Sequence, residues 1–324
     1  MTKQYDVVAL GESLIDFTPA GINEMGMQLF SCNPGGAPSN VLAMFTKLEG
    51  KTAFIGKVGN DAFGRFLTQN MAEADIDISG VQKDAVVPTT LAFVQLDEYG
   101  DRSFSFYRNP GADLMLTNNE VPLALLKNCR TFHFGSVSLT DEPCRSATLE
   151  AAKTAKTAGA IISYDPNYRP FLWKDSVHAR EELTAAVPLA DLVKVSDEEM
   201  TFLTGQTDFL KGASALAELG PVLIVVTLGD KGAYFYTKNA SALVPTYLVD
   251  TVDTTGAGDA FWGALLWQIK GKCLDEIAGM SEDAWRKVVQ FANAAGSLTT
   301  TSKGAIPAMP DKFAIDACLK QNKI

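Results

Sequence analysis

Cysteine and histidine are both scarce in this chain of 324 residues, which contains five cysteines and two histidines. The cysteines are odd in number and widely spaced, and no Cys-x-x-Cys pair occurs, which argues against a disulfide framework and against a zinc site. Two histidines leave little material for a Ser-His-Asp or Cys-His mechanism. We expect His133, which lies in an apolar run, to belong to the core.

Long apolar runs and an excess of positive charge are also absent. No uninterrupted apolar run reaches the roughly 18 residues of a membrane span, and the N-terminus lacks the basic and apolar segments of a signal peptide. The formal net charge of −10 argues against nucleic acid or an anionic membrane as a partner. We therefore expect a cytoplasmic protein.

From residue 131 onward, short apolar runs alternate with helical patterns. Strands are expected at 132–136, 160–164, 192–195, 222–227 and 233–236, and helices at 142–158, 176–187, 210–219 and 283–301. Repeated β-α units predict an α/β fold with a mostly parallel sheet that is covered on both faces. Because no linker or repeat is found, we expect one domain spanning residues 1–324.

The N-terminal part adds two expected strands, 5–10 and 52–58, with Asp16 shortly after the first. An acid just past the carboxyl end of a buried strand lies where open α/β sheets bind ligands, although a turn carboxylate is the plain alternative. Asp61 is expected to cap a helix over 62–74.

Residues 89–108 have a different pattern from the rest of the chain, because residues 103–106 alternate strictly between serine and phenylalanine. This pattern predicts a β-hairpin with one apolar face and a turn at 98–101. We expect it to belong to a small sheet that stands off the main layer, with 27–32 as a partner strand.

The stretch from Asp253 to Gln268 joins a small-residue turn to a helix that is expected to be amphipathic. Gly256 and Gly258 let backbone N–H groups approach a ligand, and the first N–H groups of a helix attract anions. Asp259 lies in the first turn of the same helix. A carboxylate beside an anion site fits phosphoryl transfer, in which one group takes a proton while others hold the phosphoryl group. The alternative is an acid that merely stabilises the helix.

The segment 33–40 contains a second glycine pair, Gly35 and Gly36, followed by Asn40 and an expected helix over 41–48. The glycines allow the backbone to approach a ligand, and an asparagine amide offers both the donor and the acceptor that a sugar hydroxyl needs. The alternative is a plain turn in which Ser39 or Asn40 caps the helix.

Several of these segments resemble one family. The stretch 253–263 resembles the C-terminal signature of the ribokinase-like, phosphofructokinase-B type carbohydrate kinases, and 56–64 resembles their N-terminal signature. The segment 35–40 resembles their sugar-binding Gly-Gly and Asn, and the segments 108–113 and 164–169 look most like fructokinases. The resemblance covers about residues 5–310. It implies a three-layer α/β/α fold with a small β-sheet lid, formed from about 16–32 and 88–112.

The resemblance also implies roles for single residues. Asp259 would be the catalytic base, and the backbone of Gly256, Ala257 and Gly258 would form the anion hole. The implied sugar contacts are Asp16, Gly35, Gly36, Asn40, Arg108, Asn167 and Arg169. The implied nucleotide contacts are Thr227, Gly229, Gly232, Asn293 and Gly304. Asp253 and Thr255 match ligands of K⁺, and Glu199 matches an acid that organises Mg²⁺. One position departs from the family pattern, because Ser196 stands where the family has asparagine.

The activity implied is ATP-dependent phosphorylation of the terminal hydroxyl of a ketose, with fructose as the expected acceptor. A kinase for 2-keto-3-deoxygluconate, ribose or aminoimidazole riboside would use the same residues and stays open. So does a non-catalytic sugar-binding regulator, although an intact Asp259 speaks against it. Pairing of lids between subunits in the family implies a homodimer through the lid.

Overall fold

The structure is a computed structural model that describes residues 3–96 and 102–321. Its main sheet has nine strands in the order β13-β12-β11-β10-β9-β8-β1-β4-β5. Neighbours from β5 to β11 pair in parallel, while β12 and β13 are antiparallel additions at one edge. The strands are β1 (Tyr5–Leu10), β4 (Thr52–Gly59), β5 (Asp77–Asp84), β8 (Cys129–Gly135), β9 (Ile161–Asp165), β10 (Leu192–Ser196), β11 (Leu223–Thr227), β12 (Ala233–Tyr236) and β13 (Ser241–Val244).

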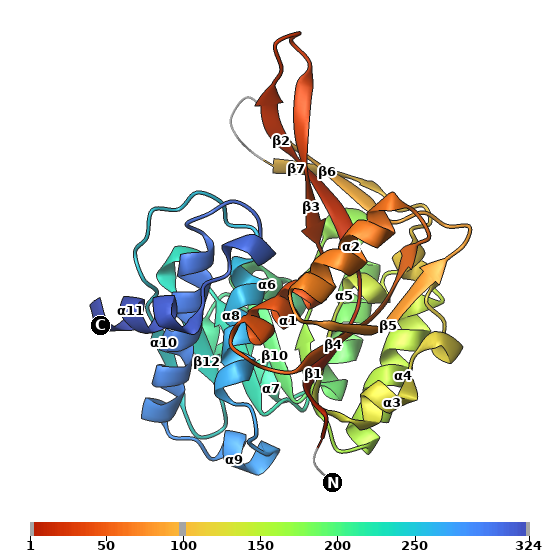
Figure 1. The fold of residues 1–324 in the computed structure, drawn as a ribbon. Coiled ribbons are helices and arrows are strands. Elements are labelled where there is room, and N and C mark those ends of the chain that lie inside the picture. Colours follow the sequence, from red (N-terminus) through yellow and green to blue (C-terminus); the bar gives the residue numbers. More distant parts are fainter. Residues whose placement is uncertain (1–2, 97–101, 322–324) are drawn as a thin grey trace.

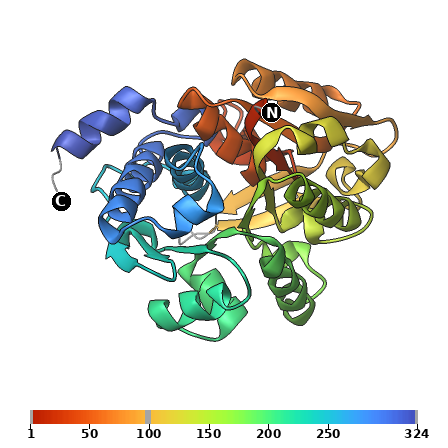
Figure 2. The ribbon, with the colours of Figure 1, turned by 90° about the horizontal axis from the view of Figure 1, so that it is seen from below.

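The main sheet is buried on both faces. Successive residues of a strand point to opposite faces, so neighbouring residues of one strand pack into different cores. In β1, Val7 and Ala9 belong to one hydrophobic core, and Val8 and Leu10 belong to the other. Helices cover both cores, as Figures 1 and 2 show, and this confirms the predicted three-layer α/β fold. The first core is covered by α1 (Ala37–Lys47), α2 (Ala62–Glu73), α8 (Ala257–Gln268), α9 (Leu274–Ala278), α10 (Glu282–Thr299) and α11 (Lys312–Gln321). The second is covered by α3 (Leu123–Lys127), α4 (Cys144–Thr157), α5 (Ser176–Ala186), α6 (Asp197–Thr204) and α7 (Phe209–Ala217).

A second, four-stranded sheet rises from the body (Figure 1). Its order is β3-β2-β6-β7, formed by β3 (Gln28–Gly35), β2 (Leu14–Ile22), β6 (Leu91–Leu96) and β7 (Arg102–Tyr107). Strand β2 begins shortly after β1 ends, so this sheet stands at the carboxyl edge of the parallel strands. The pairing of β6 with β7 is antiparallel, as predicted for the hairpin. The predicted turn at 98–101 lies outside the described residues.

Three expectations about local structure need correction. Asp16 lies within strand β2 rather than in a turn, whereas the segment expected at 27–32 is a strand of the small sheet as predicted, where it pairs with β2. Helix α1 begins at Ala37 and not at Val41, because Gly36 adopts a φ of 123° and starts it. Neither Ser39 nor Asn40 therefore caps that helix.

Helix α8 is the third correction, because it is not amphipathic. Each residue from Asp259 to Leu266 is buried. A helix that is apolar all round belongs inside a protein, and α8 lies between α1 and α10 in the first core. Among the described residues, no helix is long and apolar enough to span a bilayer.

Candidate active site

Asp259 lies in the first turn of α8, where that helix has no side-chain cap. Gly256 precedes the helix with a φ of 77°, and a Cβ at this position would lie 2.5 Å from the Cβ of Ala305. Ala257 donates its N–H to the Thr254 carbonyl at 3.3 Å. Within the described chain, the N–H groups of Gly256, Gly258 and Asp259 donate to no backbone carbonyl. The N-terminus of α8 thus keeps three backbone donors for an anion.

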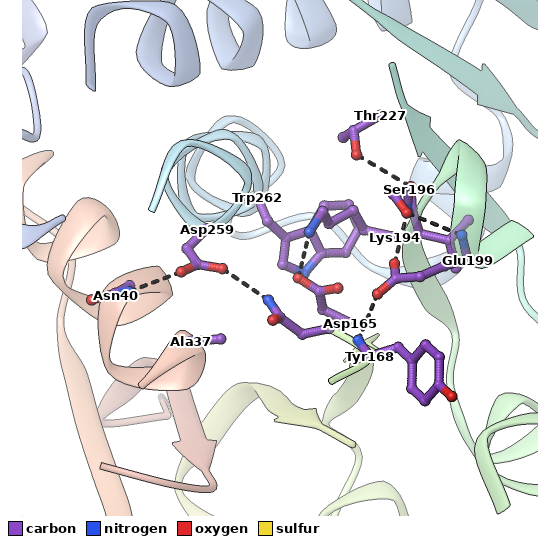
Figure 3. A network of polar contacts seen from close by, with 12 residues as sticks. Ala37, Asn40, Asp165, Tyr168, Lys194, Ser196, Glu199, Thr227, Asp259 and Trp262 are labelled. Atoms are coloured by element: carbon purple, nitrogen blue, oxygen red, sulfur yellow. Dashed lines mark hydrogen bonds and ion pairs between the residues drawn. The ribbon is translucent and has the colours of Figure 1, made fainter. Parts of the chain in front are cut away.

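Two side-chain amides hold the Asp259 carboxylate. Asn40 of α1 donates to Oδ2 at 2.9 Å, and Asn167, just past β9, donates to Oδ1 at 3.2 Å. Figure 3 shows the contact between Asn40 and Asp259. Burial raises the pKa of Asp259, while the Lys194 ammonium and the Asn40 amide act in the opposite direction. The carboxylate is therefore fixed in orientation and is a better proton acceptor than an exposed aspartate.

A buried ion pair lies beside Asp259 (Figure 3). The Nζ of Lys194, on β10, lies 2.6 Å from Oδ2 of Asp165, at the end of β9. A Cβ on Gly258 would lie 3.2 Å from that ammonium, which places Lys194 next to the uncapped helix end. Burial alone would lower the pKa of Lys194, but the carboxylates of Asp165, Glu199 and Asp259 raise it. A permanent positive charge therefore faces the site.

Asp16 and the glycine pair meet on the side of the small sheet. A Cβ on Gly35 would lie 2.2 Å from Oδ2 of Asp16, so only glycine fits there. Burial raises the pKa of Asp16 to about 6. The charge of Arg169 lowers this pKa, and the charge of Asp259 raises it further. The Oδ1 of Asn40 is buried without a hydrogen-bond partner. Asp16 and Asn40 together present acceptors that suit hydroxyl groups.

The buried Glu12 supports this loop from beneath. Its Oε1 accepts the Ala37 N–H at 2.9 Å, at the start of α1, while its Oε2 is buried without a partner. Burial raises the pKa of Glu12 to about 7.

The predicted nucleotide residues lie at the end of β11, in the turn that follows it, and in α10. Gly229 and Gly232 form the turn between β11 and β12, and Thr227 ends β11. The Asn293 amide donates to the carbonyls of Val244 and Pro245, both at 3.0 Å, so it supports the segment after β13.

The residues matched to K⁺ form a closed turn of their own. The Oδ1 of Asp253 accepts the Thr255 N–H at 3.0 Å and the Thr255 hydroxyl at 2.7 Å. Its Oδ2 accepts the N–H of Gly304 at 3.0 Å, which ties the loop after α10 to this turn. Within residues 3–96 and 102–321, no group of three or more His, Cys, Asp or Glu side chains forms a metal site.

Glu199 and Ser196 form a capping box at the start of α6. Ser196 Oγ accepts the Glu199 N–H at 3.0 Å, and Glu199 Oε2 accepts the Ser196 N–H at 2.8 Å. Serine at this position therefore completes a helix cap in this chain. The other oxygen, Oε1, accepts the Tyr168 N–H at 2.6 Å.

The two arginines predicted to contact the sugar, Arg108 and Arg169, differ in their exposure and in their partners. Arg108 forms a buried ion pair with Asp113 and donates to the Val137 carbonyl and the Thr140 hydroxyl. Its side chain is 3% exposed, so the guanidinium is engaged by the protein, and nothing in this geometry supports the predicted sugar contact. Arg169 is exposed, and its charge acts on Asp16 and Asp259.

Sequence reasoning missed Lys194, Asp165 and Glu12 as parts of this site. A signal existed for the first, because Lys194 interrupts an apolar strand, and a lysine that is buried there needs a partner. Asp165 ends strand β9 at the edge where α/β sheets bind ligands.

Comparison with known proteins identifies a family for nearly the whole chain. A model of the pfkB family of carbohydrate kinases matches residues 4–312. The chain is 47% identical over 307 residues to probable fructokinase-2 of Arabidopsis thaliana, which covers 94% of this chain and 92% of that protein.

Solved structures are similar over nearly the whole chain. A fructokinase from Xylella fastidiosa with bound ATP has a TM-score of 0.90 and 33% identity, covering 98% of this chain and 99% of that one. A fructokinase from Vibrio cholerae O395, bound to fructose, ADP and calcium ion, has a TM-score of 0.85 and 37% identity, covering 97% and 99%.

Proposed function

Because the chain belongs to the pfkB family of carbohydrate kinases, we propose that it transfers the γ-phosphoryl group of ATP to the 6-hydroxyl of fructose. The single observation that carries this proposal is Asp259, a buried carboxylate beside three unengaged backbone N–H groups. The similarity to fructokinases, with ATP or fructose bound in the solved relatives, supports the choice of substrates.

In the proposed reaction, the Asp259 carboxylate accepts the proton of the attacking hydroxyl. The hydroxyl oxygen forms a bond to the γ-phosphorus, and the bond from that phosphorus to the ADP oxygen breaks. The N–H groups of Gly256, Gly258 and Asp259 stabilise negative charge on the phosphoryl oxygens. The Lys194 ammonium lies next to these N–H groups and adds a positive charge at the proposed phosphoryl site. A base in position contributes typically 10²–10⁴-fold to such a step.

Sugar binding falls to the residues on the other side of Asp259. Asp16 and the unpartnered Oδ1 of Asn40 accept hydrogen bonds from sugar hydroxyls. Gly35 leaves the space in which Asp16 lies. The small sheet rises above these residues, and we propose that it acts as a lid which excludes water, because water would otherwise compete as the nucleophile.

The residues near Lys194 fit a cation bound together with ATP. The charges of Asp165, Glu199 and Asp259 all act on the single ammonium of Lys194, and Oδ1 of Asp165 is buried without a partner. Mg²⁺ bound with the nucleotide would neutralise phosphate charge, with Glu199 organising it through water. Asp253 and Thr255 would contribute to a K⁺ site that orders the turn before α8.

Replacing the base tests the proposal directly. We expect Asp259→Asn to lower kcat by about 10²–10⁴-fold, because asparagine cannot accept the proton. The fold should be retained, because Asn167 can still donate to the remaining oxygen, and Asn40 can turn its unpartnered Oδ1 toward the new NH₂ group. Turnover is measured as ADP formed in the presence of fructose, and Tm as the check on folding. Near wild-type turnover in a folded variant would contradict the mechanism.

A substrate panel tests the acceptor. Phosphorylation rates with fructose, ribose, aminoimidazole riboside and 2-keto-3-deoxygluconate should be highest for fructose. A preference for the acidic sugar would instead assign Arg169 to a substrate carboxylate. Fructose no better than ribose would refute the fructokinase assignment while leaving the kinase assignment in place.

A further inference from the structure

Asn167 has a backbone conformation that few side chains adopt. Its φ is 47°, in the left-handed region where residues other than glycine are uncommon and asparagine is tolerated best. Only two other non-glycine residues in the described chain, Glu49 and Asp75, have positive φ values. Strained backbone that persists at a site must be held there by its surroundings.

Contacts on both sides hold this backbone in place. The N–H of Tyr168, the next residue, donates to Glu199 Oε1 at 2.6 Å. The carbonyl of Pro166, the preceding residue, accepts the Ser136 N–H at 3.0 Å. The ring of Tyr168 also stacks on Phe202 of α6, with ring centroids 4.6 Å apart. The loop after β9 is thus fixed to the start of α6 and to the end of β8.

The fixed backbone directs the Asn167 amide at Asp259. The contact joins Nδ2 of Asn167 to Oδ1 of Asp259 at 3.2 Å, and only the NH₂ end of an amide can donate to a carboxylate. Asn40, which lies in α1, donates to the other carboxylate oxygen, Oδ2. With one donor on each oxygen, the carboxylate cannot rotate without losing a hydrogen bond.

We propose that Asn167 is a positioning residue for the catalytic base, and that its left-handed backbone, held by Glu199 through the Tyr168 N–H, sets the orientation of Asp259. The inference rests on the proposed kinase function. It assigns to Asn167 a role other than sugar binding, and it links Glu199 to the base through protein contacts alone.

The test separates the side chain from the backbone by comparing two variants. Asn167→Gly removes the amide but tolerates the left-handed backbone, whereas Asn167→Ala removes the amide and strains the backbone as well. Asp75→Gly and Asp75→Ala form the matched control pair, because Asp75, just after the C-cap of α2, has a φ of 58°. For each protein, Tm, KM for fructose and the pH profile of kcat/KM are measured.

We expect both Asn167 variants to lower kcat by about tenfold and to move the acid limb of kcat/KM upward by about one pH unit, because the carboxylate loses a donor. Only the alanine variant should also lose several degrees of Tm. The Asp75 pair should change Tm alone. A wild-type profile in Asn167→Gly, or a change confined to Asn167→Ala, would overturn the inference.

A third outcome is equally decisive. If Asn167→Gly raises KM for fructose and leaves kcat and the acid limb unchanged, Asn167 is only a sugar contact and the inference is wrong. Failure of the proposed function has a different signature, because the wild-type protein itself would then show no fructose-dependent, Asp259-dependent turnover.

Discussion

At the scale of single residues, buried carboxyl groups govern how the site responds to pH. Asp259 and Glu12 are buried and Asp16 is half-buried, and burial raises the pKa of each. Their positions differ, however. Asp16 and Asp259 face the place proposed for the substrates, whereas Glu12 holds the start of α1. The consequences of replacing them therefore differ in kind.

Asp16→Asn should affect sugar binding more than turnover. The neutral amide accepts weaker hydrogen bonds than the carboxylate, so KM for fructose should rise by about 10-fold or more while kcat changes less. Because the pKa of Asp16 is about 6, wild-type sugar affinity should fall below that pH. Steady-state kinetics between pH 5 and pH 8 measure both effects. A fall in kcat with an unchanged KM would contradict the proposed contact.

Glu12→Gln should stabilise the protein at alkaline pH. The folded pKa of about 7 exceeds the ordinary 4.5, so the folded state binds more protons than the unfolded state between these values. Stability is therefore lost as pH rises through this window, at a cost of about 3 kcal/mol above pH 7. Glutamine can still accept the Ala37 N–H without carrying charge.

The measurement is Tm at pH 5 and at pH 8 for both proteins. The wild type should lose more Tm between these values than Glu12→Gln, although Asp16 contributes a loss of the same sign to both. Equal losses in the two proteins would show that Glu12 is not the source.

At the scale of elements, the N-terminus of α8 is partly buried and yet has no side chain that caps its first N–H groups. A buried helix end normally needs a side-chain cap, as Asp61 supplies for α2 by accepting the Gly64 N–H. Helix α8 has none, and glycine stands at its N-cap, Gly256, and in its first turn, Gly258. The unmet donors are explained if a phosphoryl group satisfies them during the reaction.

Gly258→Ala should separate stability from activity. Alanine favours a helix over glycine by up to about 1 kcal/mol, but its methyl group would lie 3.2 Å from Lys194 Nζ, beside the proposed anion site. We expect kcat to fall by about 10²-fold with little change in Tm. Gly279→Ala, at the end of α9 and far from the small sheet in Figure 1, is the control and should keep its turnover. An equal loss of activity and Tm would indicate simple misfolding.

At the scale of the whole molecule, the small sheet presents an aromatic face. Phe17 stacks on Phe93 with centroids 4.7 Å apart, and Phe30 and Tyr107 contact Phe93 edge-on. Phe30 is 39% exposed and Tyr107 is 67% exposed. An exposed apolar face and sheet edges favour association, so we propose that the chain forms a homodimer through this sheet.

Light scattering tests the dimer. The double variant Phe30→Ser and Tyr107→Ser should shift the protein toward monomer at micromolar concentration, because the apolar area available for pairing decreases. Phe313→Ser is the matched control, since Phe313 is 82% exposed but lies on α11. A wild-type protein that is monomeric under these conditions would contradict the proposal.

The sequence by itself determined the layered α/β fold, because strand and helix periodicity depends only on neighbours along the chain. It also determined the place of Asp259, since the glycines and the acid are adjacent in one short stretch. It was less successful where burial is decided by distant segments. The all-round burial of α8 and the strand around Asp16 were not predicted, because α1 and α10 cover the former and β3 and β6 pair with the latter.

Only the tertiary structure decided which side chains surround the base. Asn40 and Asn167 lie 219 and 92 residues from Asp259 along the chain, yet both donate to it. Lys194 and Asp165 meet because β9 and β10 are neighbours in the sheet. Arg108 was expected at the sugar but is buried against Asp113. Contacts of this kind depend on the order of the parallel strands in the sheet, and that order cannot be predicted from local residue patterns.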